Sequence, residues 1–179
     1  MPRWAIFGAV GLAFVTACSE PAKRDVSTPP EPERPVELRA VNVNELDAEL
    51  AEHRGKVVLI DVWFLGCAPC VKRFPKFVDL HRELGAEGLV CISLNVYPEE
   101  LKKKDKVLEF LKDQKANTIN LIVDDTEKAL GAWQDKYDAG PTPSYVILNR
   151  KGEWVKTPQP EDKENVSRTL KKLLAENSP

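Results

Sequence analysis

Apolar residues in this chain follow two patterns that alternate along the sequence. Short runs of β-branched, aliphatic and aromatic residues predict buried strands. These runs are Val57 to Phe64, Leu89 to Val96, Ile119 to Val123 and Ser144 to Leu148. Elsewhere leucines, valines and alanines recur three or four residues apart among charges, which predicts amphipathic helices. These segments are Asn44 to His53, Ala68 to Leu84, Glu99 to Lys115, Glu127 to Tyr137 and Asp162 to Ala175. The alternation predicts an α/β sheet with helices on both faces.

A turn signal near the end of the chain predicts a β-hairpin. Gly152 ends the polar stretch Asn149 to Gly152 between two apolar runs, so Ser144 to Leu148 should pair with a short strand at Glu153 to Lys156. The apolar pattern begins near Val36, and we expect one folded domain at residues 36–179. This size is reasonable, because single cores of roughly 100–150 residues already bury most of their apolar surface.

The first residues read as a targeting segment. Arg3 is followed by an apolar run from Trp4 to Val15, which is too short to span a bilayer, since a spanning helix needs ~20 residues. The run leads into Val15-Thr16-Ala17-Cys18, which resembles the lipobox of bacterial lipoproteins. We therefore expect a lipoprotein signal peptide at residues 1–17 and lipidation of Cys18. The alternatives are an ordinary secretory signal with an incidental cysteine, or an uncleaved short anchor.

A polar tether should join Cys18 to the domain. Residues 18–35 are rich in proline and charge and nearly free of large apolar side chains, so they cannot bury enough surface to order themselves. Prolines favour extended conformations, and at ~3 Å per residue this segment would hold the domain up to several tens of ångströms from a membrane. We therefore expect an exported domain, anchored through lipid and facing the periplasm or another extracytoplasmic space.

Charge and cysteine content narrow the functional classes. The formal net charge is −2, from 26 basic and 28 acidic residues, which gives no basic field for nucleic acid. The 4 cysteines are too few and too unevenly spaced for the disulfide framework of a small secreted domain. Cys91 lies in an apolar run, where a lone cysteine is usually a small buried hydrophobe, and we assign it no chemistry.

Cys67 and Cys70 form a Cys-x-x-Cys motif between a predicted strand and a predicted helix. Cys67 would lie at the helix start, where free N–H groups and the helix dipole stabilise the thiolate that attacks disulfides. Cys70 follows one turn later and could resolve the mixed disulfide, so that the pair cycles between dithiol and disulfide. Pro69 costs little in the first turn, because its missing N–H would have no helical partner there.

Two other readings of this motif are a structural disulfide and half of a zinc site. A structural zinc site needs four ligands, and His53 and His81 share no short motif with the cysteines, so we expect no metal. The motif alone leaves a structural disulfide open, because extracytoplasmic compartments favour oxidation.

Residues around the motif resemble a known family. Asp61 lies six residues before Cys67, Trp63 completes a D-x-W pattern, and Pro75 follows Cys70 by five residues. Thr142-Pro143 precedes the strand Ser144 to Leu148. Together these residues resemble the TlpA/ResA-like class of membrane-anchored thiol–disulfide oxidoreductases over roughly residues 36–175. The resemblance implies a thioredoxin fold with a central mixed β-sheet flanked by helices, and a helix–strand insertion at Glu99 to Asp124, between the second and third thioredoxin strands.

The same resemblance implies roles for the site residues. Asp61 would be a buried acid that exchanges a proton with Cys70, because burial raises the pKa of a carboxyl group. Its alternative is an acid on an edge strand facing water. Pro143 would be a cis proline beside Cys67, and Trp63, Thr142 and Pro143 would contact substrate.

Two residues depart from the family pattern. Gly66 replaces the tryptophan usual before the first cysteine, which would open the rim of the site. Ser93 stands where a lysine often accompanies the buried acid, so Asp61 would lack that partner. Outside the site, the charged run Glu99 to Lys106 should form a solvated helix face.

We therefore expect an enzyme without a cofactor that reduces protein disulfides through Cys67 and Cys70. Its partners would be disulfide-containing clients, with apocytochrome c as one class that the resemblance suggests, and a membrane-bound electron donor. Two alternatives are a net oxidant, since direction depends on the redox potentials, and a copper-binding module of the Sco type, which uses two cysteines and a distal histidine.

Overall fold

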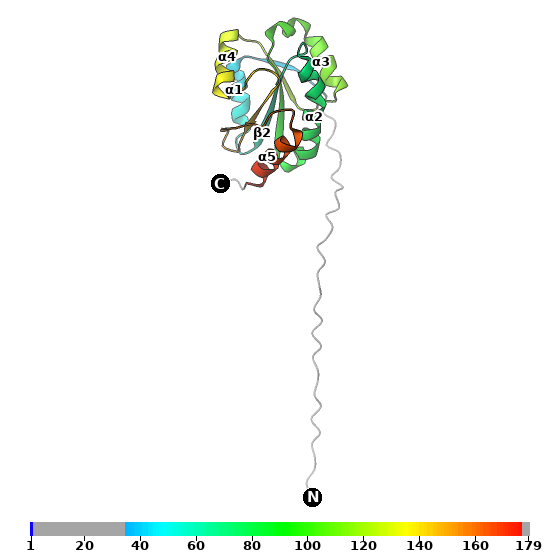
Figure 1. Ribbon diagram of the computed structural model, residues 1–179, viewed down its shortest axis with the longest axis vertical. Helices are drawn as coiled ribbons and strands as arrows, with labels where there is room; N and C mark the ends of the chain where they lie inside the picture. The colour runs from blue at the N-terminus through cyan, green and yellow to red at the C-terminus, as the bar shows by residue number, and fades with distance from the viewer. Residues whose placement is uncertain (2–34, 177–179) are drawn as a thin grey trace. The chain divides into compact units, whose positions relative to one another are not determined.

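The strands form one mixed sheet in the computed structural model, which describes Met1 and residues 35–176 (Figure 1). The order across the sheet is β1-β4-β3-β2-β5-β6. The strands are β1 (Arg39–Val41), β2 (Val57–Trp63), β3 (Leu89–Asn95), β4 (Ile119–Val123), β5 (Ser144–Leu148) and β6 (Trp154–Val155). The expected signal peptide, Cys18 and the tether up to residue 34 lie outside the described residues.

The strand β2 is the centre of this sheet. It runs parallel to β3, with Asp61 beside Ser93, and antiparallel to β5, with Asp61 beside Tyr145. β4 is parallel to both β3 and β1, and β6 pairs antiparallel with β5. All seven residues of β2 are buried, so its C-terminal end gives a rigid base for whatever follows it.

Helices cover both faces of the sheet. Figure 1 shows α1 and α4 on one side of the sheet and α2 and α3 on the other. The helical segments are α1 (Val43–Glu52), α2 (Ala68–Leu84), η1 (Gly85–Glu87), η2 (Pro98–Lys103), α3 (Lys104–Asp113), α4 (Glu127–Lys136) and α5 (Lys163–Ala175), where η marks a 3-10 helix. None of the helices within residues 35–176 is both long enough and apolar enough to cross a membrane.

Alternation along β2 divides the core in two. Val58, Ile60 and Val62 pack with side chains of α1 and α4. Leu59 and Trp63 pack with side chains of α2, α3 and α5. Because side chains two residues apart in a strand share a face, Asp61 points toward the side of α2.

The observed elements follow the sequence patterns with three differences. The expected helix from Glu99 is split into η2 and α3. The three-residue strand β1 was not predicted, because it is too short to show an apolar period. The hairpin forms, with Gly152 at a φ of +77° that favours glycine, but β6 is only two residues long. The inserted helix and strand are present as α3 and β4, and β4 lies inside the sheet.

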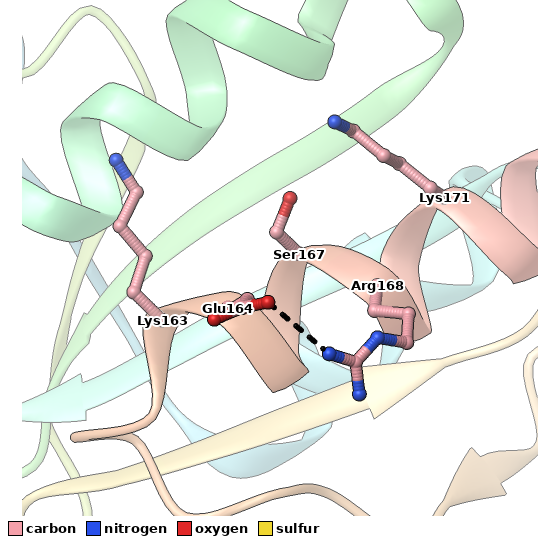
Figure 2. A pocket seen from close by; sticks show the side chains of 5 residues that line it. All are labelled: Lys163, Glu164, Ser167, Arg168 and Lys171. Atoms are coloured by element: carbon pink, nitrogen blue, oxygen red, sulfur yellow. Dashed lines mark hydrogen bonds and ion pairs between the residues drawn. The ribbon is translucent and has the colours of Figure 1, made fainter.

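A surface hollow of about 520 Å³ lies along α5 (Figure 2). Arg168, at its edge, pairs with Glu164, and Lys163 pairs with Glu83 near the C-terminal end of α2. At 1.5 Å per residue, that end of α2 lies about 20 Å from the helix start. The hollow is therefore far from the cysteine pair, and three of its charged side chains, Lys163, Glu164 and Arg168, already pair with one another or with α2. Its lining residues are Lys163, Glu164, Ser167, Arg168 and Lys171.

Candidate redox site

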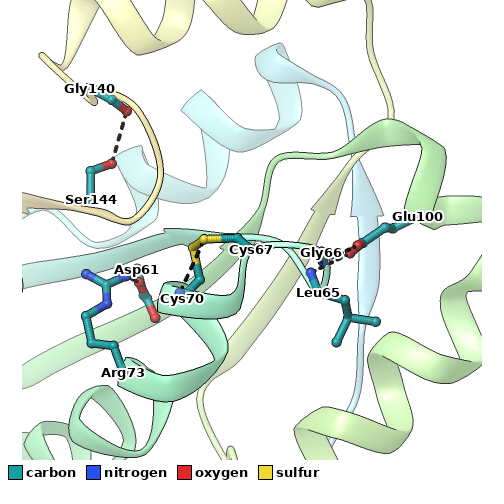
Figure 3. The surroundings of a disulfide bond; sticks show 9 residues. All are labelled: Asp61, Leu65, Gly66, Cys67, Cys70, Arg73, Glu100, Gly140 and Ser144. Atoms are coloured by element: carbon teal, nitrogen blue, oxygen red, sulfur yellow. Dashed lines mark hydrogen bonds and ion pairs between the residues drawn. A yellow bond between two sulfur atoms is a disulfide. The ribbon is translucent and has the colours of Figure 1, made fainter.

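Cys67 and Cys70 are joined by a disulfide at the start of α2 (Figure 3). Their Cα atoms lie 5.2 Å apart. Cys67 is the N-cap residue of α2, and its carbonyl accepts the first helical hydrogen bond from the Val71 N–H at 3.1 Å. The C-terminal end of β2 and the N-terminal end of α2 therefore place the pair just beyond the end of a central strand of the sheet.

The two sulfurs have different surroundings. Cys67 is 7% exposed, whereas Cys70 is completely buried. The Cys70 N–H donates to the Cys67 Sγ at 3.2 Å. This contact, together with the positive end of the helix dipole, would stabilise a thiolate on Cys67 after reduction. The geometry thus gives Cys67 access to a partner and hides Cys70 behind it.

Glu100 fixes the loop that enters the site. Its carboxylate accepts from the Leu65 N–H at 2.9 Å and the Gly66 N–H at 3.1 Å (Figure 3). It also accepts from Asn95 Nδ2 at 2.7 Å. The expectation of a solvated face is wrong at this position, because Glu100 is only 8% exposed. The side chain instead satisfies two backbone N–H donors of the loop that leads to Cys67.

An aromatic pair covers the position where the sequence suggested an open rim. The ring of Phe64 stacks on that of Tyr97, with centroids 5.2 Å apart. A Cβ atom on Gly66 would lie 3.0 Å from Phe64 Cε2, closer than such contacts normally allow. Glycine at this position therefore makes room for Phe64, and the rim is lined by an aromatic residue from within the loop.

Asp61 lies behind the disulfide, fully buried, and pairs with Arg73 of α2 (Figure 3). The central place of β2 excludes the edge-strand alternative. Arg73 is itself only 5% exposed, and its guanidinium carbon lies 4.2 Å from the centre of the Tyr145 ring. Because Arg73 follows Cys70 by three residues, the two share a face of α2. Cys70 and Asp61 thus belong to one buried cluster.

Burial raises the pKa of Asp61 to about 7, and the nearby Arg73 charge opposes part of that rise. A carboxyl group with this pKa can accept and return a proton near neutral pH. Ser93 stands beside Asp61 in place of the family's lysine, as expected, but Asp61 still has a basic partner because Arg73 supplies a cation from α2. Ser93 instead accepts a hydrogen bond from Trp63 Nε1 at 2.9 Å.

Trp63 is a core residue, which corrects its expected place at the substrate surface. The ring is fully buried, and it contacts Phe74 and Phe110 with centroid distances of 4.8 and 5.1 Å. A side chain so enclosed cannot touch a macromolecular substrate. Its D-x-W spacing from Asp61 instead reflects the period of a strand, which turns both side chains toward α2.

The loop before β5 carries the other expected site residues. The peptide bond between Thr142 and Pro143 is cis. Both residues are partly exposed, and Ser144 pairs with Val62 at the end of β2, next to the loop that leads to Cys67. The Ser144 hydroxyl donates to the Gly140 carbonyl at 3.3 Å (Figure 3). Thr142 and Pro143 therefore lie at the same end of β2 as the disulfide.

Sequence reasoning missed Arg73, Glu100 and Tyr145. One signal was present for Arg73, which is charged but shares the apolar face of α2 with Cys70 and Phe77. Charged residues on such a face are rarely fully buried unless they are paired. Nothing in the sequence pattern distinguished Glu100 from its solvated neighbours, because its partners are backbone groups of a distant loop.

The histidines lie far from the cysteine pair. His81 follows Cys70 by eleven residues in α2, so it is about 16 Å away along the helix. His53 follows α1, at the opposite end of β2 from Cys67, and contacts Glu49 at 3.0 Å. Cys91 is buried, and its pKa is raised by burial and by the charge of Asp61, so it remains a neutral thiol.

Comparison with known sequences places these features in context. A model of the Redoxin family matches residues 22–174. The thiol-disulfide oxidoreductase ResA of Bacillus subtilis (strain 168) is 29% identical over 108 residues, which cover 60% of this chain and 55% of ResA. The chain thus spans about half the length of the curated relatives that it matches.

Solved structures share the fold. The thioredoxin domain of the thiol-disulfide oxidoreductase BVU-2223 from Bacteroides vulgatus has a TM-score of 0.57 at 17% identity, covering 70% of this chain and 84% of that one. The exposed lipoprotein thioredoxin Etrx1 of Streptococcus pneumoniae has a TM-score of 0.53 at 21% identity, covering 69% and 90%. The thioredoxin fold predicted from the sequence is therefore confirmed.

Proposed function

Because this chain belongs to the Redoxin family, we propose that it is an enzyme that exchanges thiols and disulfides through Cys67 and Cys70. The observation that carries this proposal is the asymmetry of the pair, with Cys67 slightly exposed (7%) at the helix start and Cys70 fully buried beside an acid. A structural disulfide has no need of either feature. The name of ResA, a thiol-disulfide oxidoreductase, supports the same chemistry.

In the reductive direction the exchange has two steps. The Cys67 thiolate attacks one sulfur of a client disulfide, which breaks that bond, forms a mixed disulfide and releases one client thiolate that takes up a proton. The Cys70 thiolate then attacks Cys67 Sγ, which forms the disulfide seen here and releases the second client thiolate. The client gains two electrons and two protons, and the protein dithiol loses them.

Asp61 serves the second step. Cys70 is buried and must lose its proton before it attacks, and the Asp61 carboxylate is the acceptor that the cluster supplies. Its pKa of about 7 leaves it partly ionised at neutral pH, so it can take the proton without remaining protonated afterwards.

Clients should bind along the cis-proline loop. Thr142 and Pro143 are partly exposed and lie at the end of β2 that carries the disulfide. An extended client segment can pair with their backbone there. We propose protein disulfides as the clients, with apocytochrome c as one class, and a membrane-bound dithiol as the donor that reduces the Cys67–Cys70 disulfide again.

The equilibrium redox potential of the full chain, in a Cys18→Ala background, tests the function and its direction. We expect full conversion of Cys67 and Cys70 between dithiol and disulfide in glutathione buffers, with a potential near that of thioredoxin, about −270 mV. A value near about −120 mV would make the protein an oxidant, and a pair that never exchanges with glutathione would make the disulfide structural.

We further propose that residues 1–17 are a lipoprotein signal peptide, that Cys18 is lipidated, and that residues 18–35 tether the domain 36–179 outside the cytoplasm. Support comes from the apolar run that ends at Val15-Thr16-Ala17-Cys18, and from the polar, proline-rich residues after it. The name of Etrx1, an exposed lipoprotein thioredoxin with the same fold, supports this proposal.

Replacing Cys18 with alanine should release the protein from membranes or leave an unprocessed precursor. Acyl chains contribute about 0.8 kcal/mol per buried CH₂ group, and two or more chains are needed for a stable anchor. Fractionation of the native host and mass spectrometry of the N-terminal peptide measure this directly. Ser19→Ala, one residue away, is the matched control and should stay anchored. An unmodified wild-type peptide at Cys18 would disprove lipidation.

A further inference from the structure

We propose that Arg73 is a positioning residue for the resolving step, because it occupies Oδ1 of Asp61, favours the ionised carboxylate, and leaves Oδ2 to take the Cys70 proton. This inference rests on the proposed exchange function and adds to it a residue from the helix that carries the cysteines. Its experiment separates the resolving step from the first attack, so that a failure of one is distinguishable from a failure of the other.

The contacts of the buried pair divide the two carboxylate oxygens between different tasks. Arg73 Nη2 donates to Asp61 Oδ1, whereas Asp61 Oδ2 is buried and has no hydrogen-bond partner among residues 35–176. An acceptor held on one side by a cation and open on the other has a single oxygen available for a proton. Cys70 and Arg73 share a face of α2, and Figure 3 shows Asp61 beside both of them.

Arg73 is itself held in place. Its guanidinium lies over the Tyr145 ring at 4.2 Å, a cation–π contact, and Tyr145 is the β5 residue directly beside Asp61. Nε and Nη1 of Arg73 are buried and have no hydrogen-bond partner in the described part of the chain. Arg73 therefore pairs with no carboxylate other than Asp61 in the described part of the chain, and its charge stabilises the ionised form of that group.

Other groups around Asp61 do not supply a competing charge. Cys91 and Ser93 face it from β3, and Tyr145 faces it from β5. Burial and the charge of Asp61 raise the pKa values of Cys91 and Tyr145, so both stay neutral from pH 5 to 9. Glu161, before α5, is exposed, and its negative charge also helps to raise the pKa of Tyr145. Within the described residues, Arg73 is thus the cation that opposes the rise in the pKa of Asp61 caused by its burial.

A two-step reaction with an aromatic disulfide, 5,5′-dithiobis(2-nitrobenzoate), isolates the effect. With the reduced full chain in a Cys18→Ala background, the first burst of thionitrobenzoate reports attack by Cys67, and the second reports attack by Cys70 on the mixed disulfide. An opposite charge within ~4–6 Å lowers the pKa of a carboxyl by about 1–3 units. Arg73→Met should therefore move the lower limb of the second-step pH profile upward by about 1–3 pH units.

At pH 7 the second step of Arg73→Met should be slower by about fivefold or more, which is the fold-change that a shift of one unit gives. Arg73→Lys keeps the charge and should restore most of the profile. Arg82→Met is the matched control, because Arg82 is an exposed arginine of the same helix that pairs with Asp79 at 3.6 Å. Its profile should equal that of the parent protein.

A double variant keeps the test valid if Arg73→Met destabilises the fold. In a background with Asp61→Asn, the change Arg73→Met should no longer alter the second-step profile, because its effect acts through the carboxylate. An unshifted lower limb in Arg73→Met, or an equal slowing in the presence and absence of Asp61, would overturn the proposal. A slower first burst with an unchanged second step would place the effect of Arg73 on the attack by Cys67 and would also overturn the proposal.

Discussion

Replacing Cys67 with serine should abolish disulfide exchange, whereas replacing Cys70 with serine should leave a protein that accumulates mixed disulfides with its clients. Cys67 is 7% exposed whereas Cys70 is fully buried, and the Cys67 sulfur accepts a hydrogen bond from the Cys70 N–H at the helix start. Serine at position 67 removes the nucleophile, so turnover should fall to the uncatalysed rate. Serine at position 70 permits the first attack but removes the group that resolves it.

Both changes can be measured by non-reducing electrophoresis and by reduction of insulin disulfides with the Cys18→Ala chain. Cys91→Ser is the matched control, because Cys91 is a buried thiol outside the pair, and it should retain both turnover and release of clients. If Cys67→Ser were to trap clients while Cys70→Ser trapped none, the roles of the two cysteines would be reversed.

Asp61→Asn should slow the resolving step by about 10²-fold or more near pH 7, the range that a general base commonly contributes. Asparagine keeps the shape of the side chain but cannot accept a proton. The parent profile should rise with pH through about 7 as Asp61 ionises, and this limb should disappear in the variant. The second burst of thionitrobenzoate, followed from pH 5 to 9, measures both effects. A rate and profile equal to those of the parent would remove Asp61 from the mechanism.

The same variant should change stability in two opposing ways. The folded pKa of Asp61 lies above its usual value of 3.8, so the folded state binds the proton more tightly than the unfolded state does. The free energy of unfolding should therefore fall as pH rises from about 4 to about 7, and Asp61→Asn should remove this decline. The variant also leaves the Arg73 charge buried without its carboxylate, and breaking a buried pair in this way costs about 3–5 kcal/mol.

These two effects are of similar size near neutral pH, because removing the rise of the pKa from 3.8 to about 7 restores about 4 kcal/mol. We therefore expect the free energy of unfolding of Asp61→Asn to stay close to that of the parent at pH 7. Urea unfolding at pH 5, 7 and 9 measures this balance. The double change Asp61→Asn with Arg73→Met removes both charges and should be more stable than the single variant. A single variant several kcal/mol less stable than the parent at pH 7 would show that the buried Arg73 charge dominates.

Local signals made much of the site predictable. The apolar periods located β2 and α2, and the placement of Cys67 at the boundary between them follows from the order of those two patterns. A buried acid in β2 was expected because Asp61 interrupts an apolar run. These inferences need only neighbouring residues, and the structure agrees with the positions they gave.

Other features depend on contacts between distant segments, which a single sequence does not encode in a readable period. Arg73 meets Asp61 across the space between a helix and a sheet. Glu100 meets the loop at Leu65 from an inserted segment 35 residues later. Trp63 matched a family pattern, but its burial depends on Phe110 of α3, so its role could be judged only after the helix was placed.

The hydrogen bonds of the Glu100 carboxylate make the inserted segment part of the candidate redox site. The η2 segment supplies the hydrogen-bond acceptors for two amides of the loop before Cys67, so the Cys-x-x-Cys motif depends on residues outside β2 and α2. A graft of β2 and α2 alone into another scaffold would leave the Leu65 and Gly66 amides without their carboxylate. For a protein engineer, the smallest unit that can be transplanted therefore runs from β2 through η2, and it includes β3 as the strand that connects them.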